Sequence, residues 1–411
     1  MTDTNQLTQW LEEHFPDLRQ APAGMMKHPY LTLGADYGAG GRTFLWDAFF
    51  EAVRLWHNQG EYADVIKGTV ECYLDTVNPA TGEGWRVIAP DGPLHLGSEH
   101  MQPFLCQFAY LSNLLSPFKE RHEEILARLT ATLDYWQRER STLYGLFRWL
   151  DSYESGIDMN PAVDICPPLT VVGVDLNVYL LLEYRALAEL AQTWDKPEQA
   201  AGFIKEAECL AQNIRKHLWN DRKGLFCNLD TRSGEFIEGF GEELSIFPWT
   251  NFTPLYAGIA TAEQATEMIE RYLLNPEAFR CRYGFRTFDR RSVFYTEQRV
   301  CILGFMPHRP NQRTGSNWQG AVWVLSNYLL SHGLAHYGYQ QEALAVAQET
   351  VQLCWQNIEE SGGMYESFHP RTGKGLWAKG VMSWNVLADV MGMEIETGSF
   401  ALKGIIQKKQ D

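Results

Sequence analysis

Residues 198–226, EQAAGFIKEAECLAQNIRKHLWNDRKGLF, contain the pattern that decides the fold. Their apolar side chains recur at helical spacing and form one stripe, which consists of Phe203, Ile204, Ala207, Leu210, Ile214 and Leu218. A polar turn follows, and the chain continues with Gly224 and two bulky apolar residues. The stretch therefore predicts an amphipathic helix that ends in a tight turn.

The same unit recurs along the chain. Helical patterns occupy roughly 44–58, 60–76, 99–115, 117–137, 172–194, 198–218, 262–273, 317–334, 339–358 and 380–391. For 117–137, Ser116 is the expected N-cap and Pro117 the first helical residue. A glycine followed by bulky apolar residues also stands at Gly84, Gly145, Gly284 and Gly363.

These units repeat roughly every 60 residues, and a unit of that length holds two helices. Six such units make twelve helices, which can close as an inner ring inside an outer ring. Strand-like alternation is confined to short stretches such as 226–229. We therefore predict an all-α protein, an (α/α)6 barrel with short β-hairpin loops at one face. An open α-solenoid is the alternative, but its repeats would be shorter and more regular.

Composition describes a folded protein with many aromatic residues: 14 Trp, 18 Tyr and 21 Phe. Such rings fill large cores, and they also stack on the apolar faces of sugars. Because no Ser/Gly linker divides the chain, we interpret 1–411 as a single barrel domain, with a frayed tail at 403–411. The eight cysteines are scattered, which predicts reduced and mostly buried thiols.

The chain has 35 Lys and Arg against 51 Asp and Glu, a net charge of -16. This charge repels phosphate backbones and anionic lipid surfaces, so we expect neither nucleic acid nor membrane as a partner. The start shows no signal-peptide pattern and no later stretch approaches 18 apolar residues, which predicts a cytoplasmic protein. The oligomeric state stays open, a homo-oligomer included.

Two loops carry carboxylates among aromatic residues. The loop YESGIDMNP, 153–161, contains Glu154 and Asp158, and the loop GGMYESFHPRTGKG, 362–375, contains Glu366. A helix-capping turn is the alternative for the first loop, and a solvated glutamate is the alternative for the second. Asp158 and Glu366 lie 208 positions apart, about half the chain, so the two loops should face each other across the barrel. Two facing carboxylates are what glycoside hydrolysis requires.

Five segments stand in order along the chain: GGRTFLWDAFF (40–50), ESGIDMNP (154–161), VDLNVYL (174–180), NWQGAVWVLSNYLL (317–330) and YESFHPRTGKG (365–375). Together they resemble motifs of glycoside hydrolase family 63, in particular its short bacterial members that cleave mannosylglycerate and glucosylglycerate. The chain departs from the family at Met159 and Asn160, which replace Asn and Ser, and at Gln319 and Ala321, which replace Arg and Pro. These departures bear on which sugar and which leaving group are accepted.

The resemblance implies an (α/α)6 barrel with the hairpin loops at its active-site face. It implies an inverting, exo-acting α-glycosidase for a small α-glucoside or α-mannoside, such as glucosylglycerate or mannosylglycerate, without metal or organic cofactor. Asp158 is similar to the family's general acid, which we expect to be protonated in a secluded site, and Glu366 is similar to its general base. Asp47 would accept hydrogen bonds from sugar hydroxyls.

Further substrate-binding candidates lie in or beside these segments: Trp46, Phe49, Gln102, Trp149, Tyr153, Gly156, Trp318, Trp323, Tyr365 and Trp384. Core packing is the alternative for Trp46 and Phe49, and inner-ring packing is the alternative for Trp318 and Trp323. A carboxylate on the leaving group would need cations, for which the loops offer Arg42, Arg86, Arg148, Arg309, Arg313 and Lys379.

Two other functions remain open at this point. A sugar 2-epimerase can use the same barrel but depends on paired histidines, and only His100 and His369 lie in candidate loops. A non-catalytic carbohydrate-binding protein would keep the cleft without turnover. The sequence does not separate glucose from mannose.

Overall fold

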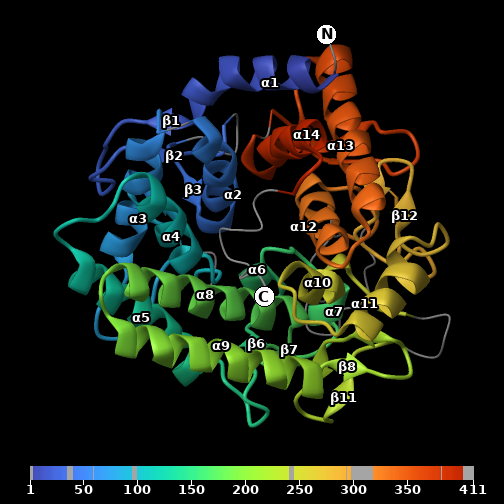
Figure 1. Ribbon diagram of the computed structural model, residues 1–411, viewed down its shortest axis with the longest axis horizontal. Helices are drawn as coiled ribbons and strands as arrows, with labels where there is room; N and C mark the ends of the chain where they lie inside the picture. The colour runs from blue at the N-terminus through green and yellow to red at the C-terminus, as the bar shows by residue number, and fades with distance from the viewer. Residues whose placement is uncertain are drawn as a thin grey trace.

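A computed structural model describes residues 3–34, 40–58, 60–94, 100–239, 245–292, 294–297, 318–380 and 382–400. Six of its described helices stand around a common centre (Figure 1): α2 (Leu45–Leu55), α4 (Leu105–Leu115), α8 (Val174–Thr193), α10 (Thr253–Tyr256), α12 (Val324–His336) and α14 (Leu387–Thr397). Each of them contacts the next one along the chain, and α14 contacts α2, so the inner ring closes. The predicted frayed tail, 403–411, lies outside the described residues.

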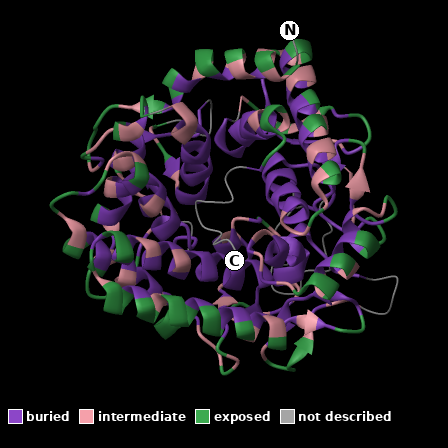
Figure 2. Ribbon diagram, in the orientation of Figure 1, coloured by how far each residue is buried: buried purple, intermediate pink, exposed green. Residues whose placement is uncertain are grey.

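An outer ring surrounds this inner one. It contains α1 (Asp3–His14), α3 (Ala63–Thr76), α5 (His122–Glu139), α9 (Pro197–His217), α11 (Ala262–Met268), which continues as η5 (Ile269–Leu273), and α13 (Gln340–Ser361). Every residue of α2 is buried, whereas α9 buries only one stripe. Ala207, Leu210 and Ile214 lie on this stripe as predicted, but Ile204 is exposed. Figure 2 shows the same contrast between the buried inner helices and the half-exposed outer ones. The predicted (α/α)6 barrel is confirmed.

Helix α1 completes the outer ring. It contacts α13 and α14, which places the start of the described chain beside its last helices (Figure 1). One continuous hydrophobic core runs through both rings, and Leu7 and Leu11 of α1 belong to it. None of the described helices is both long and apolar enough to cross a bilayer.

Short antiparallel strands follow several outer helices, at the glycine turns that the sequence indicated. These hairpins are β8 (Trp219–Asn220) with β9 (Leu225–Phe226), β12 (Arg280–Cys281) with β13 (Gly284–Phe285), and β14 (Tyr365–Phe368) with β15 (Gly375–Lys379). Two further sheets are β1 (Arg19–Gln20) with β2 (Tyr30–Leu31), and β3 (Thr43–Phe44), β4 (Val87–Ala89) and β5 (Gly92–Pro93). A four-stranded sheet has the order β11-β10-β7-β6, formed by Glu235–Phe236, Leu229–Asp230, Val171–Val172 and Arg148–Trp149.

Equivalent asparagines attach two of these turns to the inner helices. In α8, the Oδ1 atom of Asn177 accepts the N–H of Phe147 at 2.8 Å, and its Nδ2 donates to the carbonyl of the same residue at 2.9 Å. In α12, Asn327 accepts the N–H of Phe285 at 2.9 Å and donates to the carbonyl of Tyr283 at 2.8 Å. Both asparagines are fully buried, so each repeat uses one amide side chain to satisfy turn backbone that would otherwise lack partners.

All ten predicted helical ranges contain a helix, but four of these helices, α4, α5, α12 and α14, begin at least five residues later than predicted. Helix α5 begins at His122 and has no side-chain cap, because the preceding residues form a turn that buries Phe118. Helix α12 begins at Val324, since Val322 instead forms a bridge with Phe368 of β14. The short α10 was not predicted, because four residues are too few to show a period.

Candidate active site

The starts of the inner helices meet at one end of the barrel, because each outer helix returns the chain before the next inner helix begins. Trp46 and Asp47 lie in the first turn of α2. Gln102 stands just before α4, Trp323 is the N-cap of α12, and Trp384 lies in η6 (Ser383–Val386), which precedes α14. Residues that are far apart in the sequence are therefore gathered at one barrel mouth.

Five tryptophans form a cluster at these helix starts. The rings of Trp318 and Trp323 are stacked with centroids 3.4 Å apart, and Trp249 stacks on Trp318 at 6.0 Å. Trp384 contacts Trp323 at 5.2 Å and Trp46 at 5.9 Å. All five rings are buried and pack the inner ring together, and aromatic rings are also the groups on which sugars stack.

Asp47 is the buried carboxylate of this mouth. Its Oδ1 atom accepts a hydrogen bond of 2.6 Å from the hydroxyl of Ser383. Burial raises the pKa of Asp47 to about 7; the hydrogen bond from Ser383 and the charge of Arg86 oppose this, and the charge of Asp158 adds to it. The structure therefore places Asp158 within electrostatic range of Asp47.

Glu154 anchors the loop that carries Asp158, which runs from α6 (Ser152–Ser155) to α7 (Pro161–Asp164). The Glu154 side chain is fully buried, accepts the N–H groups of His100 at 3.0 Å and Leu150 at 2.6 Å, and pairs with Arg140 at 3.0 Å. The loop is therefore fixed by a satisfied buried carboxylate.

Ser152 ties together the two ends of the same loop. Its hydroxyl donates to Asp164 at 2.6 Å and accepts the N–H of Met159 at 3.0 Å, so the residue that follows Asp158 is held in place. The side chain of Asp158 itself is exposed. The expectation of a secluded general acid is therefore wrong for the described residues, because Asp158 lies at the loop tip while Glu154 occupies the buried position.

Gly156 brings the backbone of this loop against two candidate substrate-binding residues. It has φ +78°, and a Cβ atom built there would lie 2.3 Å from Nε2 of Gln102 and 2.9 Å from the ring of Trp46. Gln102 is 1% exposed, and neither its Nε2 nor its Oε1 atom has a hydrogen-bond partner among the described residues. A buried amide without partners indicates a group that a polar ligand would satisfy.

Glu366 lies in β14, 9% exposed, and two contacts hold that strand at the mouth. Phe368 forms a bridge with Val322 just before α12, and the carbonyl of Tyr365 accepts a hydrogen bond of 2.8 Å from Asn385 of η6. The hairpin is therefore attached to the segments that carry Trp323 and Trp384.

Residues with strained backbone lie next to or in contact with Asp47, Asp158 and Glu366. Five described non-glycine residues have positive φ, and two of them, Leu169 and Asp195, lie elsewhere. Met159 (φ +53°) follows Asp158, and Ser383 (φ +33°) bonds Asp47. Trp377 (φ +70°) lies in a β-bulge opposite Glu366, since β14 and β15 pair Tyr365 with Lys379 and Ser367 with Leu376. Such strain is typical of functional sites.

Residues 42–382 match the family model described as the mannosylglycerate hydrolase MGH1-like glycoside hydrolase domain. The chain belongs to this family. The mannosylglycerate hydrolase of Rubrobacter radiotolerans is 30% identical over 258 residues, which are 62% of this chain and 51% of that protein. A mannosylglycerate hydrolase of Thermus thermophilus is 27% identical over 257 residues, 61% of this chain and 50% of that protein. The chain thus matches about half the length of these two relatives.

Solved structures share the barrel of this MGH1-like domain. A GH63 mannosylglycerate hydrolase from another strain of Thermus thermophilus, in complex with glucose, has a TM-score of 0.69 and 18% identity, and the match covers 95% of this chain and 100% of that one. Neutral trehalase Nth1 from Saccharomyces cerevisiae has a TM-score of 0.62 and 17% identity, covering 92% and 76%. At these identities the likeness supports the fold alone.

Six predicted substrate-binding residues of the MGH1-like domain belong to its buried core, namely Trp46, Phe49, Trp149, Trp318, Trp323 and Trp384. Phe49 packs on Phe50, Phe104 and Phe108, which is the alternative that the sequence left open. Trp149 is fully buried, and its indole N–H donates to Asp175 at 3.0 Å. The one polar group of Trp149 is therefore already bonded, and its contact with substrate stays a prediction.

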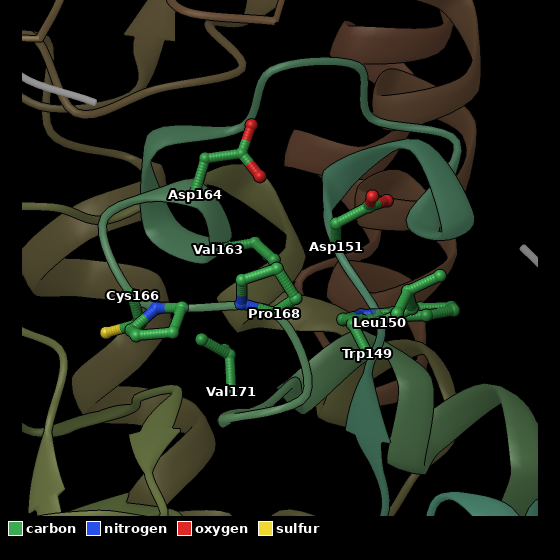
Figure 3. A pocket seen from close by; sticks show the side chains of 9 residues that line it. Trp149, Leu150, Asp151, Val163, Asp164, Cys166, Pro168 and Val171 are labelled. Atoms are coloured by element: carbon green, nitrogen blue, oxygen red, sulfur yellow. The ribbon is translucent and has the colours of Figure 1, made fainter. Parts of the chain in front are cut away.

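Trp149 also lines a small cavity behind the Asp158 loop, of about 20 Å³. Figure 3 shows Asp151 and Asp164 beside this cavity, and both carboxylates accept N–H groups of the loop backbone. The cavity has room for about one water molecule and none for a sugar. None of the five clustered tryptophans lines it.

Sequence reasoning missed other polar groups at the mouth of this MGH1-like domain. Asn251 is 1% exposed, and both polar atoms of its amide lack partners among the described residues. The motif PWTNFTP, 248–254, resembles the carboxylate loops in placing polar residues between aromatics, and this signal could have identified Asn251 and Trp249. Of the proposed cations, Arg86 donates to the carbonyl of Tyr153, Lys379 donates to that of Ser361, and Arg309 and Arg313 lie outside the described residues.

Proposed function

We propose that this chain is an inverting glycoside hydrolase that removes one terminal α-linked glucosyl or mannosyl unit from a small glycoside. The observation that carries the proposal is the attachment of two carboxylate loops to one barrel mouth. Asp158 lies on a loop whose backbone touches Gln102 and Trp46, and Glu366 lies on a hairpin tied to the segments of Trp323 and Trp384. Membership of the MGH1-like glycoside hydrolase family supports the same chemistry.

In this proposal Asp158 acts as general acid. Its carboxyl group donates a proton to the glycosidic oxygen as the bond to the anomeric carbon breaks. Its exposed side chain can approach the glycosidic oxygen of a substrate at the barrel mouth. The anchoring of the loop through Glu154 and Ser152 keeps this carboxyl group in place during the reaction.

Glu366 acts as general base on the opposite side of the sugar. It removes a proton from a water molecule that attacks the anomeric carbon, so that one displacement inverts the configuration. The buried position of Glu366 suits a group that meets only one water molecule. The proton balance closes, because Asp158 loses the proton that the leaving group takes and Glu366 gains the one that water loses.

The cleaved sugar would lie against the tryptophan cluster, and its hydroxyl groups would form hydrogen bonds with Asp47, Gln102 and Asn251. The two amides gain partners when a sugar binds, which offsets the cost of leaving them buried and unpaired. The relatives named as mannosylglycerate hydrolases suggest glycerate as the leaving group, and Arg86, whose charge acts on Asp47, is a cation that could bind its carboxylate. Glucosylglycerate and mannosylglycerate are therefore the first substrates to test.

The epimerase alternative finds no support in the positions of the histidines. His100 is buried, burial and the charge of Arg140 lower its pKa to about 3, and its Nδ1 atom accepts the N–H of Gly84 at 3.3 Å. His369 lies on the β14–β15 turn, where its Nδ1 atom accepts the N–H of Arg371 at 3.2 Å. Each ring thus uses its Nδ1 atom to hold its own turn.

The test is hydrolysis of glucosylglycerate, mannosylglycerate and short α-gluco- and α-manno-disaccharides by the wild type and by Asp158→Asn. We expect cleavage of at least one substrate, and a fall of kcat by about 10²- to 10⁴-fold in the variant. Asp134→Asn, the same change at an exposed position of α5, should leave kcat unchanged. A wild type that cleaves no glycoside but binds free sugar would favour the carbohydrate-binding alternative, and exchange of the C2 proton in free sugars would favour the epimerase.

A further inference from the structure

Ser383 connects the two halves of the proposed site. It begins η6, directly before Trp384, and its hydroxyl donates to Oδ1 of Asp47 at the start of α2, 336 positions earlier in the chain. Both side chains are buried, and the backbone N–H of Asp47 also stabilises this carboxylate. This contact joins the first inner helix to the segment that leads into the last one.

The backbone of Ser383 is strained to make this contact. Its φ of +33° lies in the region that favours glycine, yet the residue is a serine. A glycine would relieve the strain but would lack the hydroxyl. The hydrogen bond to Asp47 therefore accounts for a serine at this position, whereas the backbone conformation alone would favour a glycine.

The hairpin of Glu366 sets the position of Ser383. The N–H of Gly380 donates to the carbonyl of Met364 at 2.7 Å, and Asn385 donates to the carbonyl of Tyr365 at 2.8 Å. The bulge at Trp377 and Ala378 adds one residue to β15 between these contacts and the hairpin turn. Ser383 thus lies between two attachments to the strand that carries Glu366.

We propose that Ser383 is a positioning residue that holds Oδ1 of Asp47 so that Oδ2 accepts a hydroxyl of the bound sugar, and that it fixes this carboxylate relative to Glu366. The inference rests on the proposed function in taking a sugar as the ligand. A carboxylate held at one oxygen binds with less loss of side-chain freedom than an unheld one.

Charged and titratable groups around Asp47 set the expected pH response. These are Glu51 one turn along α2, Tyr73 of α3, Arg86 before β4, and Asp158. The Ser383 hydroxyl stabilises the ionised form of Asp47, and its removal therefore raises the pKa of that carboxyl group. Because the ionised form accepts the sugar hydroxyl, the acidic limb of kcat/KM should move to higher pH.

The experiment compares Ser383→Gly, Ser383→Ala, Asp47→Ala and the double variant Ser383→Gly/Asp47→Ala. We expect both single Ser383 variants to lose about tenfold in kcat/KM at pH 6 and to shift the acidic limb upward by about one pH unit. In the Asp47→Ala background, Ser383→Gly should cost nothing further, because its partner is already absent. Ser233→Gly, the same change on an exposed turn, is the control.

The readouts are hydrolysis of α-glucosyl and α-mannosyl fluoride, and calorimetric binding of glucose and mannose. One outcome is that the wild type cleaves a fluoride and the double variant loses the sum of what Ser383→Gly and Asp47→Ala lose separately. Ser383 then has only a structural role, so the inference is overturned while the proposed function stands. If nothing is cleaved but sugar binding shows the coupling, the inference stands and the proposed function fails. Absence of both cleavage and binding overturns both.

Discussion

The Nη2 atom of Arg140 donates a hydrogen bond of 3.0 Å to Oε1 of Glu154, and both side chains are buried. Arg140 is the C-cap of α5, whereas Glu154 lies four positions before Asp158. An outer helix thus anchors the loop of the proposed general acid. The two N–H groups that Glu154 also accepts satisfy its remaining lone pairs, which is the condition under which a buried pair is favourable.

Replacing Arg140 by Met should lower the free energy of unfolding by about 3 kcal/mol, because the Glu154 carboxylate would be left buried without its cation. Urea unfolding followed by circular dichroism measures this change. Arg138→Met is the matched control, since Arg138 lies on the same helix in an exposed pair with Glu139, and it should cost less than about 1 kcal/mol. Equal losses in the two variants would show that burial of the pair does not matter.

Gly156 and Gly362 share a φ of +78°, but only Gly156 has neighbours that a Cβ atom would meet. Both alanine variants therefore carry similar backbone strain, of about 1 kcal/mol. Gly156→Ala should also displace Gln102 and Trp46 and lower kcat/KM by at least about tenfold, whereas Gly362→Ala should keep kcat/KM unchanged. Steady-state kinetics on the cleaved substrate decides the matter, and the prediction fails if the two variants have the same activity.

Asp47 should make stability depend on pH. Its pKa rises on folding from its ordinary value of 3.8 to about 7, so the folded state keeps a proton that the unfolded state releases. This favours the folded state at acidic pH, and the advantage is lost as the pH rises from about 4 to 7, by up to about 4 kcal/mol. The difference in unfolding free energy between the wild type and Asp47→Asn should therefore change over this window. Parallel curves for the two proteins would contradict the assignment.

Asn327→Ala should destabilise the barrel by about 2–4 kcal/mol, because it removes three buried hydrogen bonds, to Phe285, Tyr283 and Thr350. Thermal and urea unfolding measure the loss. Asn213→Ala is the comparison, since Asn213 makes a single exposed bond to Gly145 and should cost less than about 1 kcal/mol. A small effect of Asn327→Ala would mean that the turn backbone finds other partners.

Much of the architecture could be predicted from the sequence, because the period of the apolar residues and the glycine turns are local signals. The stripe of α9 and the turn at Gly224 are examples. The separation of Asp158 and Glu366 by half the chain also led to the prediction that their loops meet at one mouth. The start of α5 was missed, since the burial of Phe118 overrides the capping signal of Ser116 and Pro117.

Contacts between distant segments could not be predicted in this way. Trp46 and Trp149 look alike in the sequence and both are buried, but Trp149 is bonded to Asp175 while Trp46 lies against Gly156 of the Asp158 loop. The bond between Asp47 and Ser383 depends on closure of the whole ring and leaves no local pattern. The exposure of Asp158 follows from the burial of Glu154 four residues earlier, and neither residue type alone shows which of the two is inside.

The central claim is a single displacement with Asp158 as acid and Glu366 as base, and the most direct measurement is the anomer that forms first. Proton NMR of the wild type with the α-glycoside it cleaves fastest, recorded before mutarotation, shows the anomeric signal of the released sugar. The account predicts that the β-anomer appears first and then equilibrates. If the α-anomer appears first, the configuration is retained, and Glu366 would instead have to form a covalent intermediate with the sugar.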